Sequence, residues 1–107
     1  MERFNIRELL ATRVDQRSFH VASEEHVRVE FRNMSAGEEL DSFRYAGNVV
    51  LTIFSGDFVL KVAGKLVEVS EMDQVITSTN ESIGLQCKLA GTIQIIWSPA
   101  YAQTAKI

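Results

Sequence analysis

The sequence predicts an all-β protein, an antiparallel sandwich or barrel preceded by one short helix. From Val49 onward, short apolar segments recur every eight to twelve residues, and turns that contain glycine separate several of them. Upstream, apolar and charged residues alternate over positions 27–32, which is the period of a half-buried strand. Hydrophobic residues make up 46% of the 107 residues and charged residues 23%, a balance typical of a folded globular protein.

The helix is expected over residues 5–11. Asn5 is a suitable N-cap, and Glu8 three residues later completes a weak capping box. Ile6, Leu9 and Leu10 share one face of such a helix. We therefore expect that face to pack, as a lid, on a larger body.

The strands follow in order along the chain. In the first, Val27, Val29 and Phe31 alternate with three charged residues, so its apolar face is expected to be the buried one. Further strands are predicted at 49–54, 58–63, 66–69, 74–77, 83–89 and 92–97. Pro99 lies just past the last of them, where its missing N–H costs little.

The last predicted strand is apolar on both faces. Ile93, Ile95 and Trp97 share one face, and Gln94 and Ile96 share the other. A strand of this kind is covered on both sides, by the opposing sheet and by a neighbouring subunit. The pattern therefore favours a homodimer, with cover by the N-terminal segment of the same chain as the alternative.

Composition excludes several classes of protein. The net charge of −3 disfavours a nucleic-acid-binding face. No stretch reaches the roughly 20 apolar residues that cross a bilayer, and the charged N-terminus does not fit a secretory signal. The single cysteine, Cys87, forms no internal disulfide. We expect one domain over 1–107, with a core barrel at about 27–99, in a cytoplasmic protein without a nucleic-acid or membrane partner.

The layout from Met34 to Pro99 resembles the cupin family of small double-stranded β-helix proteins. A glycine turn at 35–37 is followed by 39–44 and by the strand and turn at 49–56. The segments 58–65, 67–73 and Trp97-Ser98-Pro99 complete the match, which covers about two-thirds of the chain. The resemblance implies a jelly-roll barrel with a short N-terminal helix.

The resemblance also locates the metal site that is common in that family, and this chain lacks its ligands. The family supplies two histidines as His-x-His, a glutamate and a third histidine, and these positions fall on Ser42, Arg44, Val49 and, approximately, Ile83. A neutral hydroxyl, a guanidinium and two aliphatic side chains do not bind a metal in that manner. We therefore expect no metal and no cofactor, and a cluster of His20, His26 and the two glutamates between them is a weak alternative.

Four residues are candidates for a ligand site: Ser42, Arg44, Tyr45 and Cys87. Ser42 and Arg44 are expected to point into the barrel, where Arg44 would anchor an anionic ligand at the mouth. The structural alternative is that Arg44 extends to solvent with its stem packed on apolar neighbours. Tyr45 lies in the loop at the mouth, and Cys87 is expected to be an inert core thiol unless a histidine approaches it.

These features favour a non-catalytic, metal-free protein that binds or senses a small molecule, with an acidic group of that molecule held by Arg44. One alternative is a metal-independent isomerase or epimerase that acts on a sugar or small acid through Tyr45 and a histidine. Another is a structural or interaction module whose barrel is filled by side chains. The fold alone does not rank these functions.

Overall fold

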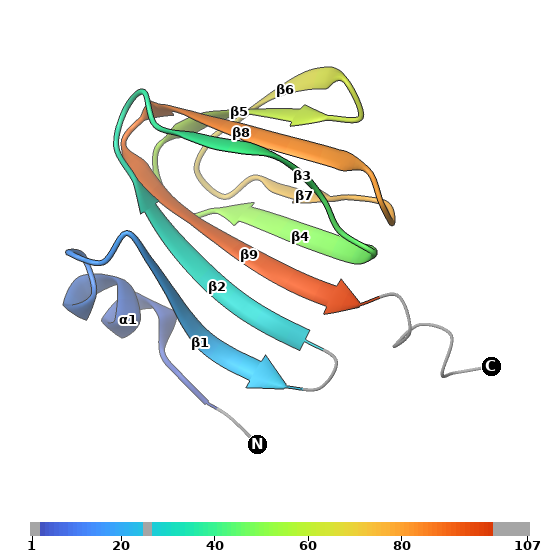
Figure 1. Cartoon of the computed structure of the whole chain (residues 1–107). Coiled ribbons are helices and arrows are strands. Elements are labelled where there is room, and N and C mark those ends of the chain that lie inside the picture. Colours follow the sequence, from blue (N-terminus) through green and yellow to red (C-terminus); the bar gives the residue numbers. More distant parts are fainter. Residues whose placement is uncertain (1–2, 25–26, 100–107) are drawn as a thin grey trace.

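The computed structural model describes residues 3–24 and 27–99, which form one helix followed by nine strands (Figure 1). Helix α1 spans Ile6–Thr12. The strands are β1 Ser18–Glu24, β2 Val27–Met34, β3 Glu39–Arg44, β4 Gly47–Ile53, β5 Asp57–Val62, β6 Lys65–Val69, β7 Gln74–Ile76, β8 Ser82–Leu89 and β9 Gly91–Pro99. No strand is predicted above for β1, whereas the strands from β4 onward lie where the sequence predicts them.

The strands form two antiparallel sheets that face each other. One sheet has the order β1-β2-β9-β4-β7 and the other the order β3-β8-β5-β6, so the chain crosses repeatedly between them (Figure 1). This order is that of a jelly roll to which β1 adds an outer strand beside β2. The predicted all-β jelly-roll barrel with a short N-terminal helix is confirmed. Among the described residues, no helix is long and apolar enough to cross a membrane.

The core lies between the two sheets. It is made of inward aliphatic and aromatic side chains from both, together with one thiol: Met34, Val49, Leu51, Ile53, Phe58, Leu60, Val69, Ile83, Leu85, Cys87, Ile93, Ile95 and Trp97. Burying a large apolar side chain stabilises the folded state by about 1.5–3 kcal/mol relative to exposure. The sandwich therefore draws its stability from residues that alternate along β4, β5, β8 and β9.

Helix α1 is capped as predicted but packs loosely. The side chain of Asn5 accepts a hydrogen bond of 2.9 Å from the Glu8 amide. The lid face of the helix is only half-buried, and no helical residue is fully buried. The segment after the helix is held more firmly, because the amide group of Asn33 donates to the carbonyls of Arg13, at 3.1 Å, and Gln16, at 2.6 Å.

Strand β2 is covered on both of its faces. Phe31 points away from the core, yet it is fully buried. Its ring stacks on Phe19 with the centroids 5.3 Å apart and lies 5.9 Å from the ring of Phe54. The apolar face of β2 is therefore buried locally on the outside of the barrel, which leaves its charged face toward the inside.

Two turns at one end of the sandwich touch backbone to backbone. A Cβ atom added at Gly91 would lie 2.0 Å from the carbonyl oxygen of Ser55, and one added at Gly56 would lie 2.5 Å from the carbonyl oxygen of Leu89. Gly56 also has a φ of +85°, which disfavours any residue with a side chain. The β4–β5 and β8–β9 turns can approach this closely only because both positions are glycine.

Candidate functional site

The inner face of β2 is its charged face, and the apolar face of this strand lies on the outside of the barrel. Residues directly opposite in an antiparallel pair share a face of the sheet. Arg28 is opposite Trp97, and Glu30 is opposite Ile95, and both partners belong to the core. The alternation along β2 is as predicted, and Phe31 on its apolar face is buried. That burial comes from aromatic rings outside the barrel, so the charged face is the one that turns inward.

Glu30 is a buried carboxylate held by three neighbours. Its Oε1 accepts a hydrogen bond of 3.2 Å from Nε1 of Trp97, and Nε2 of His20 lies 3.8 Å from the same oxygen. Nε of Arg32 lies 2.9 Å from Oε2. The buried Nε has no hydrogen bond within the described part of the chain, so this contact acts through charge alone. Such pairing offsets the cost of removing a carboxylate from water, since Glu30 is only 3% exposed.

Trp97, which donates to Glu30, also packs against two other aromatic rings. Its ring lies 5.2 Å from that of Phe43 and 5.0 Å from that of Tyr45, which meets it edge-on. The guanidinium carbon of Arg28 lies 4.7 Å from the centre of the indole, within the range of a cation–π contact. We call Arg28, Glu30, Phe43, Tyr45 and Trp97 the Trp97 cluster. It brings a cation, a neutralised carboxylate and three aromatic rings together where β2, β9 and the β3–β4 turn meet.

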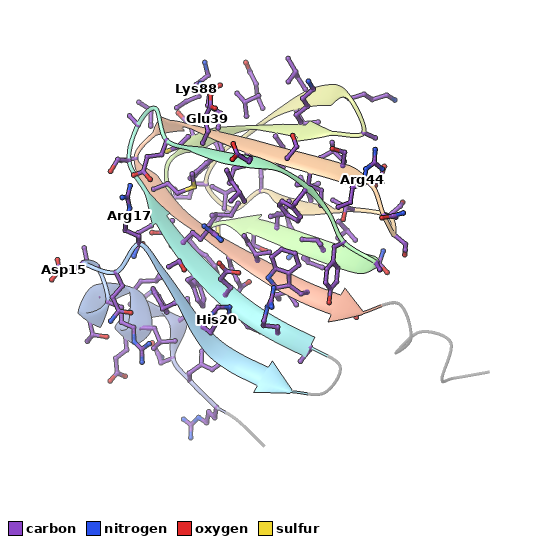
Figure 2. All side chains as sticks on the ribbon, in the orientation of Figure 1. Asp15, Arg17, His20, Glu39, Arg44 and Lys88 are labelled. Atoms are coloured by element: carbon purple, nitrogen blue, oxygen red, sulfur yellow. The ribbon has the colours of Figure 1, made fainter. Side chains whose placement is uncertain are left out.

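Of the four predicted ligand residues, Tyr45 alone belongs to this cluster. Ser42 and Arg44 are exposed and do not point inward, so that part of the prediction is wrong. Nη1 of Arg44 donates a hydrogen bond of 2.9 Å to the carbonyl of Asn80, and Figure 2 shows Arg44 at the end of β3. Contact of Ser42 or Arg44 with a ligand stays a prediction.

A bulge in β3 causes this change of face. Leu40 pairs with Leu85 and Phe43 pairs with Ile83, so two residues of β3 stand opposite the single residue Gly84. A bulge of this kind reverses the alternation beyond it. Phe43, not Ser42, therefore packs against the core.

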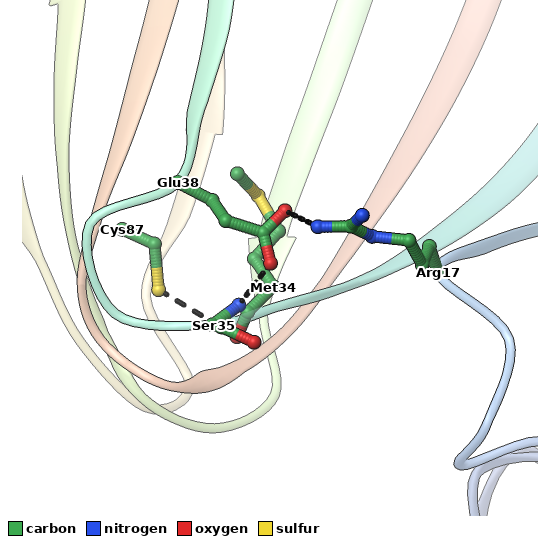
Figure 3. Close-up of polar contacts among 5 residues, drawn as sticks. All are labelled: Arg17, Met34, Ser35, Glu38 and Cys87. Atoms are coloured by element: carbon green, nitrogen blue, oxygen red, sulfur yellow. Dashed lines mark hydrogen bonds and ion pairs between the residues drawn. The ribbon is translucent and has the colours of Figure 1, made fainter.

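Cys87 lies near the C-terminal end of β8, whereas Tyr45 lies near the opposite end of the sandwich. Its Sγ contacts the carbonyl of Met34 at 3.7 Å (Figure 3). The same Sγ lies 3.2 Å from the carbonyl of Leu89. Burial, followed by the charge of Glu38, raises the pKa of the thiol. Both effects disfavour the thiolate, so Cys87 is chemically suited to a core position and not to nucleophilic catalysis.

Glu38 itself fastens the N-terminal segment to the barrel. Its Oε1 accepts a hydrogen bond of 2.9 Å from the Ser35 amide, and its Oε2 forms an ion pair with Arg17 (Figure 3). The Ser35 amide, and then Arg17, lower the pKa of the Glu38 carboxyl. The carboxylate thus joins the segment just before β1 to the β2–β3 turn.

The donors present do not fit the metal site of the family that the sequence resembles. Val49 and Ile83 are buried aliphatic residues, while Ser42 and Arg44 lie outside the barrel. Residues 3–24 and 27–99 contain no group of three or more His, Cys, Asp or Glu side chains that could hold a metal ion. The weak alternative at His20 is untested, because Glu25 and His26 lie outside the described residues.

No protein-family model matches the chain, and no curated protein matches its sequence. Solved structures match in shape. A cupin superfamily protein from Desulfitobacterium hafniense DCB-2 has 16% identity and a TM-score of 0.74, with 77% of this chain and 75% of that chain covered. An RmlC-like cupin from Shewanella frigidimarina NCIMB 400 has 16% identity and a TM-score of 0.73, with 81% and 78% covered.

An enzyme is also similar in shape. A salicylate 1,2-dioxygenase from Pseudoaminobacter salicylatoxidans, solved as adducts with gentisate, has 18% identity and a TM-score of 0.72. The match covers 83% of this chain but 26% of the dioxygenase chain. This chain therefore has the cupin fold, as the sequence predicts, and the fold alone assigns no activity to it.

Arg28, Glu30 and Trp97 are site residues that sequence reasoning missed, and it considered His20 only as a metal ligand. A signal for them exists in the pattern, because charged residues at 28, 30 and 32 alternate within a strand whose other face is largely apolar. A strand of that kind has two faces that can be covered. Which of them is inward depends on the aromatic residues Phe19 and Phe54, which are distant in sequence.

Proposed function

We propose that this protein binds a small anionic molecule at the Trp97 cluster, without a metal and without catalysing a reaction on it. The observation that carries the proposal is the position of Arg28, which is exposed to solvent while its guanidinium lies over the indole of Trp97. A guanidinium presents a planar fork of N–H donors that matches a carboxylate or phosphate group. Stacking on an aromatic face orients that fork, so less side-chain freedom is lost when an anion binds.

The charge balance of the cluster supports an anionic ligand. Glu30 would repel an anion if its charge were uncompensated. Arg32 and the indole N–H of Trp97 already face its two oxygens. The charge of Arg28 is therefore not required to balance Glu30, and it is available to attract a ligand.

The aromatic side chains support a planar ligand. Phe43 and Tyr45 are partly buried against the core and approach Trp97 from the opposing sheet and its turn. Rings of this kind pack well against flat apolar groups, while Arg28 supplies the polar contact that fixes orientation. A dioxygenase of the same fold is known in adducts with gentisate, which makes that compound a reasonable probe.

The test uses Trp97, which is the single tryptophan of the chain. Purified protein is titrated with benzoate, gentisate and inorganic phosphate while the fluorescence of Trp97 and the melting temperature are followed. We expect at least one anion to change both signals, and Arg28→Gln to weaken its binding by about tenfold or more.

Arg44→Gln is the matched control, since it removes the same charge from the outside of β3. We expect this variant to bind like the wild type. Loss of binding in Arg44→Gln with retention in Arg28→Gln would overturn the proposal in favour of the anchor predicted from the sequence. Absence of binding by every anion of a broad panel would also overturn it.

One observation favours the enzymatic alternative as a second candidate. His20 and Glu30 form a histidine–carboxylate contact of 3.8 Å beside the ring of Trp97, and Tyr45 lies against the same indole. A base and a phenolic acid are what a metal-independent isomerase requires. Incubation with sugars and small keto acids in heavy water distinguishes the two functions. Exchange of a substrate C–H proton that His20→Gln abolishes would support the enzyme, and absence of exchange is expected for a binding protein.

A further inference from the structure

Strand β6 is the last strand of its sheet and has one unpaired edge. It pairs with β5 on one side, and no other described strand pairs with it on the opposite side (Figure 1). The two-residue turn at 63–64, in which both φ angles are positive, makes Val62 and Lys65 a hydrogen-bonded pair. The alternation of an antiparallel pair then directs the backbone N–H and C=O groups of Leu66 and Glu68 away from β5.

The unpaired edge also exposes aliphatic side chains. Leu66 is 72% exposed and lies on the outward face with Lys61, its partner on β5. Val67 is 39% exposed and pairs with Leu60 of the core, so it lies on the inner face. An edge strand with exposed aliphatic side chains on both faces is a template for another strand. Strand β6 therefore offers the backbone groups of two residues and two apolar side chains to an extended chain.

An open hollow of about 560 Å³ adjoins the C-terminal end of β6. Its lining includes three apolar and three charged side chains: Phe58, Val59, Val69, Asp57, Glu68 and Lys88. The two carboxylates in this lining outnumber the single ammonium group, so the hollow favours a cation. A lysine or arginine side chain fits this combination, because its aliphatic stem packs on apolar surface while its charged end meets a carboxylate.

We propose that β6 is the docking edge for an extended segment of another protein. The segment adds to the sheet as an antiparallel strand, with a basic residue opposite Glu68 and aliphatic residues opposite Val67 and Leu66. Its order from N- to C-terminus is therefore basic, aliphatic, aliphatic, since an antiparallel strand meets Glu68 first. Backbone hydrogen bonds supply the affinity in this mode of binding, and the side chains supply the specificity. Docking at β6 is independent of ligand binding at the Trp97 cluster.

A second copy of this chain fits the edge less well than such a segment. In the antiparallel register centred on Val67, the unpaired backbone groups of the two copies meet, but Glu68 of each copy is opposite Leu66 of the other. That register places a carboxylate against an exposed aliphatic side chain twice, and it places no cation opposite Glu68. The charges and the apolar positions of β6 therefore complement a different sequence.

The test measures, by fluorescence anisotropy, the binding of a short labelled peptide with the central sequence Arg-Val-Leu between threonines. We expect saturable binding, and Glu68→Lys should weaken it by about tenfold or more because it places a cation opposite the arginine. Glu39→Lys is the matched control, since Glu39 is exposed on β3, the opposite edge strand of the same sheet. This control should leave the dissociation constant unchanged, and unchanged melting temperatures verify that both variants are folded.

N-methylated peptides separate strand pairing from attraction between charges. The N–H groups of the peptide arginine and leucine donate to the carbonyls of Glu68 and Leu66, whereas the N–H group of the valine points away from β6. A methyl group on either of the first two nitrogens should weaken binding by about tenfold, and one on the valine nitrogen should not.

Four results overturn the proposal. The first is an absence of saturable binding up to millimolar peptide, and the second is equal binding of a peptide with Asp-Val-Leu at its centre. The third is equal weakening of binding by Glu68→Lys and Glu39→Lys. The fourth is a wild-type dimer, measured by light scattering, that Glu68→Lys dissociates, because a second copy would then occupy β6.

Discussion

The indole N–H of Trp97 donates to the carboxylate of Glu30 over 3.2 Å, between the neighbouring strands β9 and β2 on the inside of the sandwich. Both side chains are almost fully buried. A buried carboxylate without such a donor would carry a desolvation cost of several kcal/mol. The pair thereby explains how a carboxylate is accommodated beside an apolar core.

Glu30→Gln should destabilise the fold. The substitution keeps the shape and one acceptor for Trp97, but it removes the charge that faces Arg32. We expect a loss of about 2 kcal/mol, less than for a fully buried ion pair because the Arg32 side chain is 33% exposed. Urea denaturation measures this loss of unfolding free energy, and Glu39→Gln at an exposed position is the control. Equal stability of Glu30→Gln and the wild type would show that the ion pair contributes nothing.

Cys87 should resist alkylation in the folded protein. Burial and then the charge of Glu38 raise its thiol pKa, so the thiolate is scarce near neutral pH and inaccessible as well. Iodoacetamide should modify the native protein slowly and the denatured protein quickly, as followed by mass spectrometry. Fast modification of the native protein would contradict the burial of this side chain.

The raised pKa of Cys87 also fixes the sign of its effect at alkaline pH. The unfolded chain releases the thiol proton at a lower pH than the folded chain does. The contribution to stability is therefore complete below the unfolded pKa and is lost as the pH rises through the folded pKa. Cys87→Ala should flatten the alkaline limb of a plot of stability against pH.

Glu38 should affect how the stability of the protein falls at acid pH. Its pKa is lower in the folded chain, since the Ser35 amide and Arg17 stabilise the carboxylate. Its contribution is present above the unfolded pKa and is lost as the pH falls through the folded pKa. Stability measured from neutral pH down into the acid range should fall less in Glu38→Gln than in the wild type. An equally steep acid limb in both proteins would refute this role.

Gly91→Ala should be strongly destabilising. Its Cβ atom would lie 2.0 Å from the Ser55 carbonyl oxygen, a backbone atom that cannot move alone. We expect a loss of about 3 kcal/mol or more in urea denaturation. Gly64→Ala is the control, because its Cβ atom meets open space and its φ of +83° costs only about 1 kcal/mol. Equal losses of unfolding free energy in Gly91→Ala and Gly64→Ala would show that the contact between the two turns does not contribute to stability.

The sequence predicts local structure well in this chain and predicts the inward faces less well. Asn5 caps the helix as expected, and the strands from β4 to β9 follow the apolar segments. Alternation identifies two faces of a strand but not which one meets the core when both are covered, as in β2. The orientation of Arg28 and Glu30 depends on Phe54, which lies over twenty residues away in sequence.

The residues of the candidate site are hard to predict for a second reason, besides the ambiguity over which face of β2 turns inward. Counting from a motif assumes regular alternation, and the bulge in β3 shifts it by one residue. Tyr45 is a candidate because it lies in the predicted loop at the mouth of the barrel, and that argument does not depend on alternation along a strand. Ser42 and Arg44 are candidates because they occupy the family's histidine positions, and their inward direction rests on alternation. The extra residue in β3 reverses that alternation and places both side chains outside.

The bulge in β3 also marks where this barrel tolerates a change of length. Residues 41 and 42 stand opposite Gly84 alone, so loss of either would leave one residue opposite one. Leu40 and Phe43 would keep their present partners and their present faces. Removal of one residue from the middle of β4 or β9, by contrast, would turn every later side chain of that strand over. Single-residue gaps between this chain and its relatives are therefore expected in the middle of β3, at residues 41 and 42, and not within the central strands.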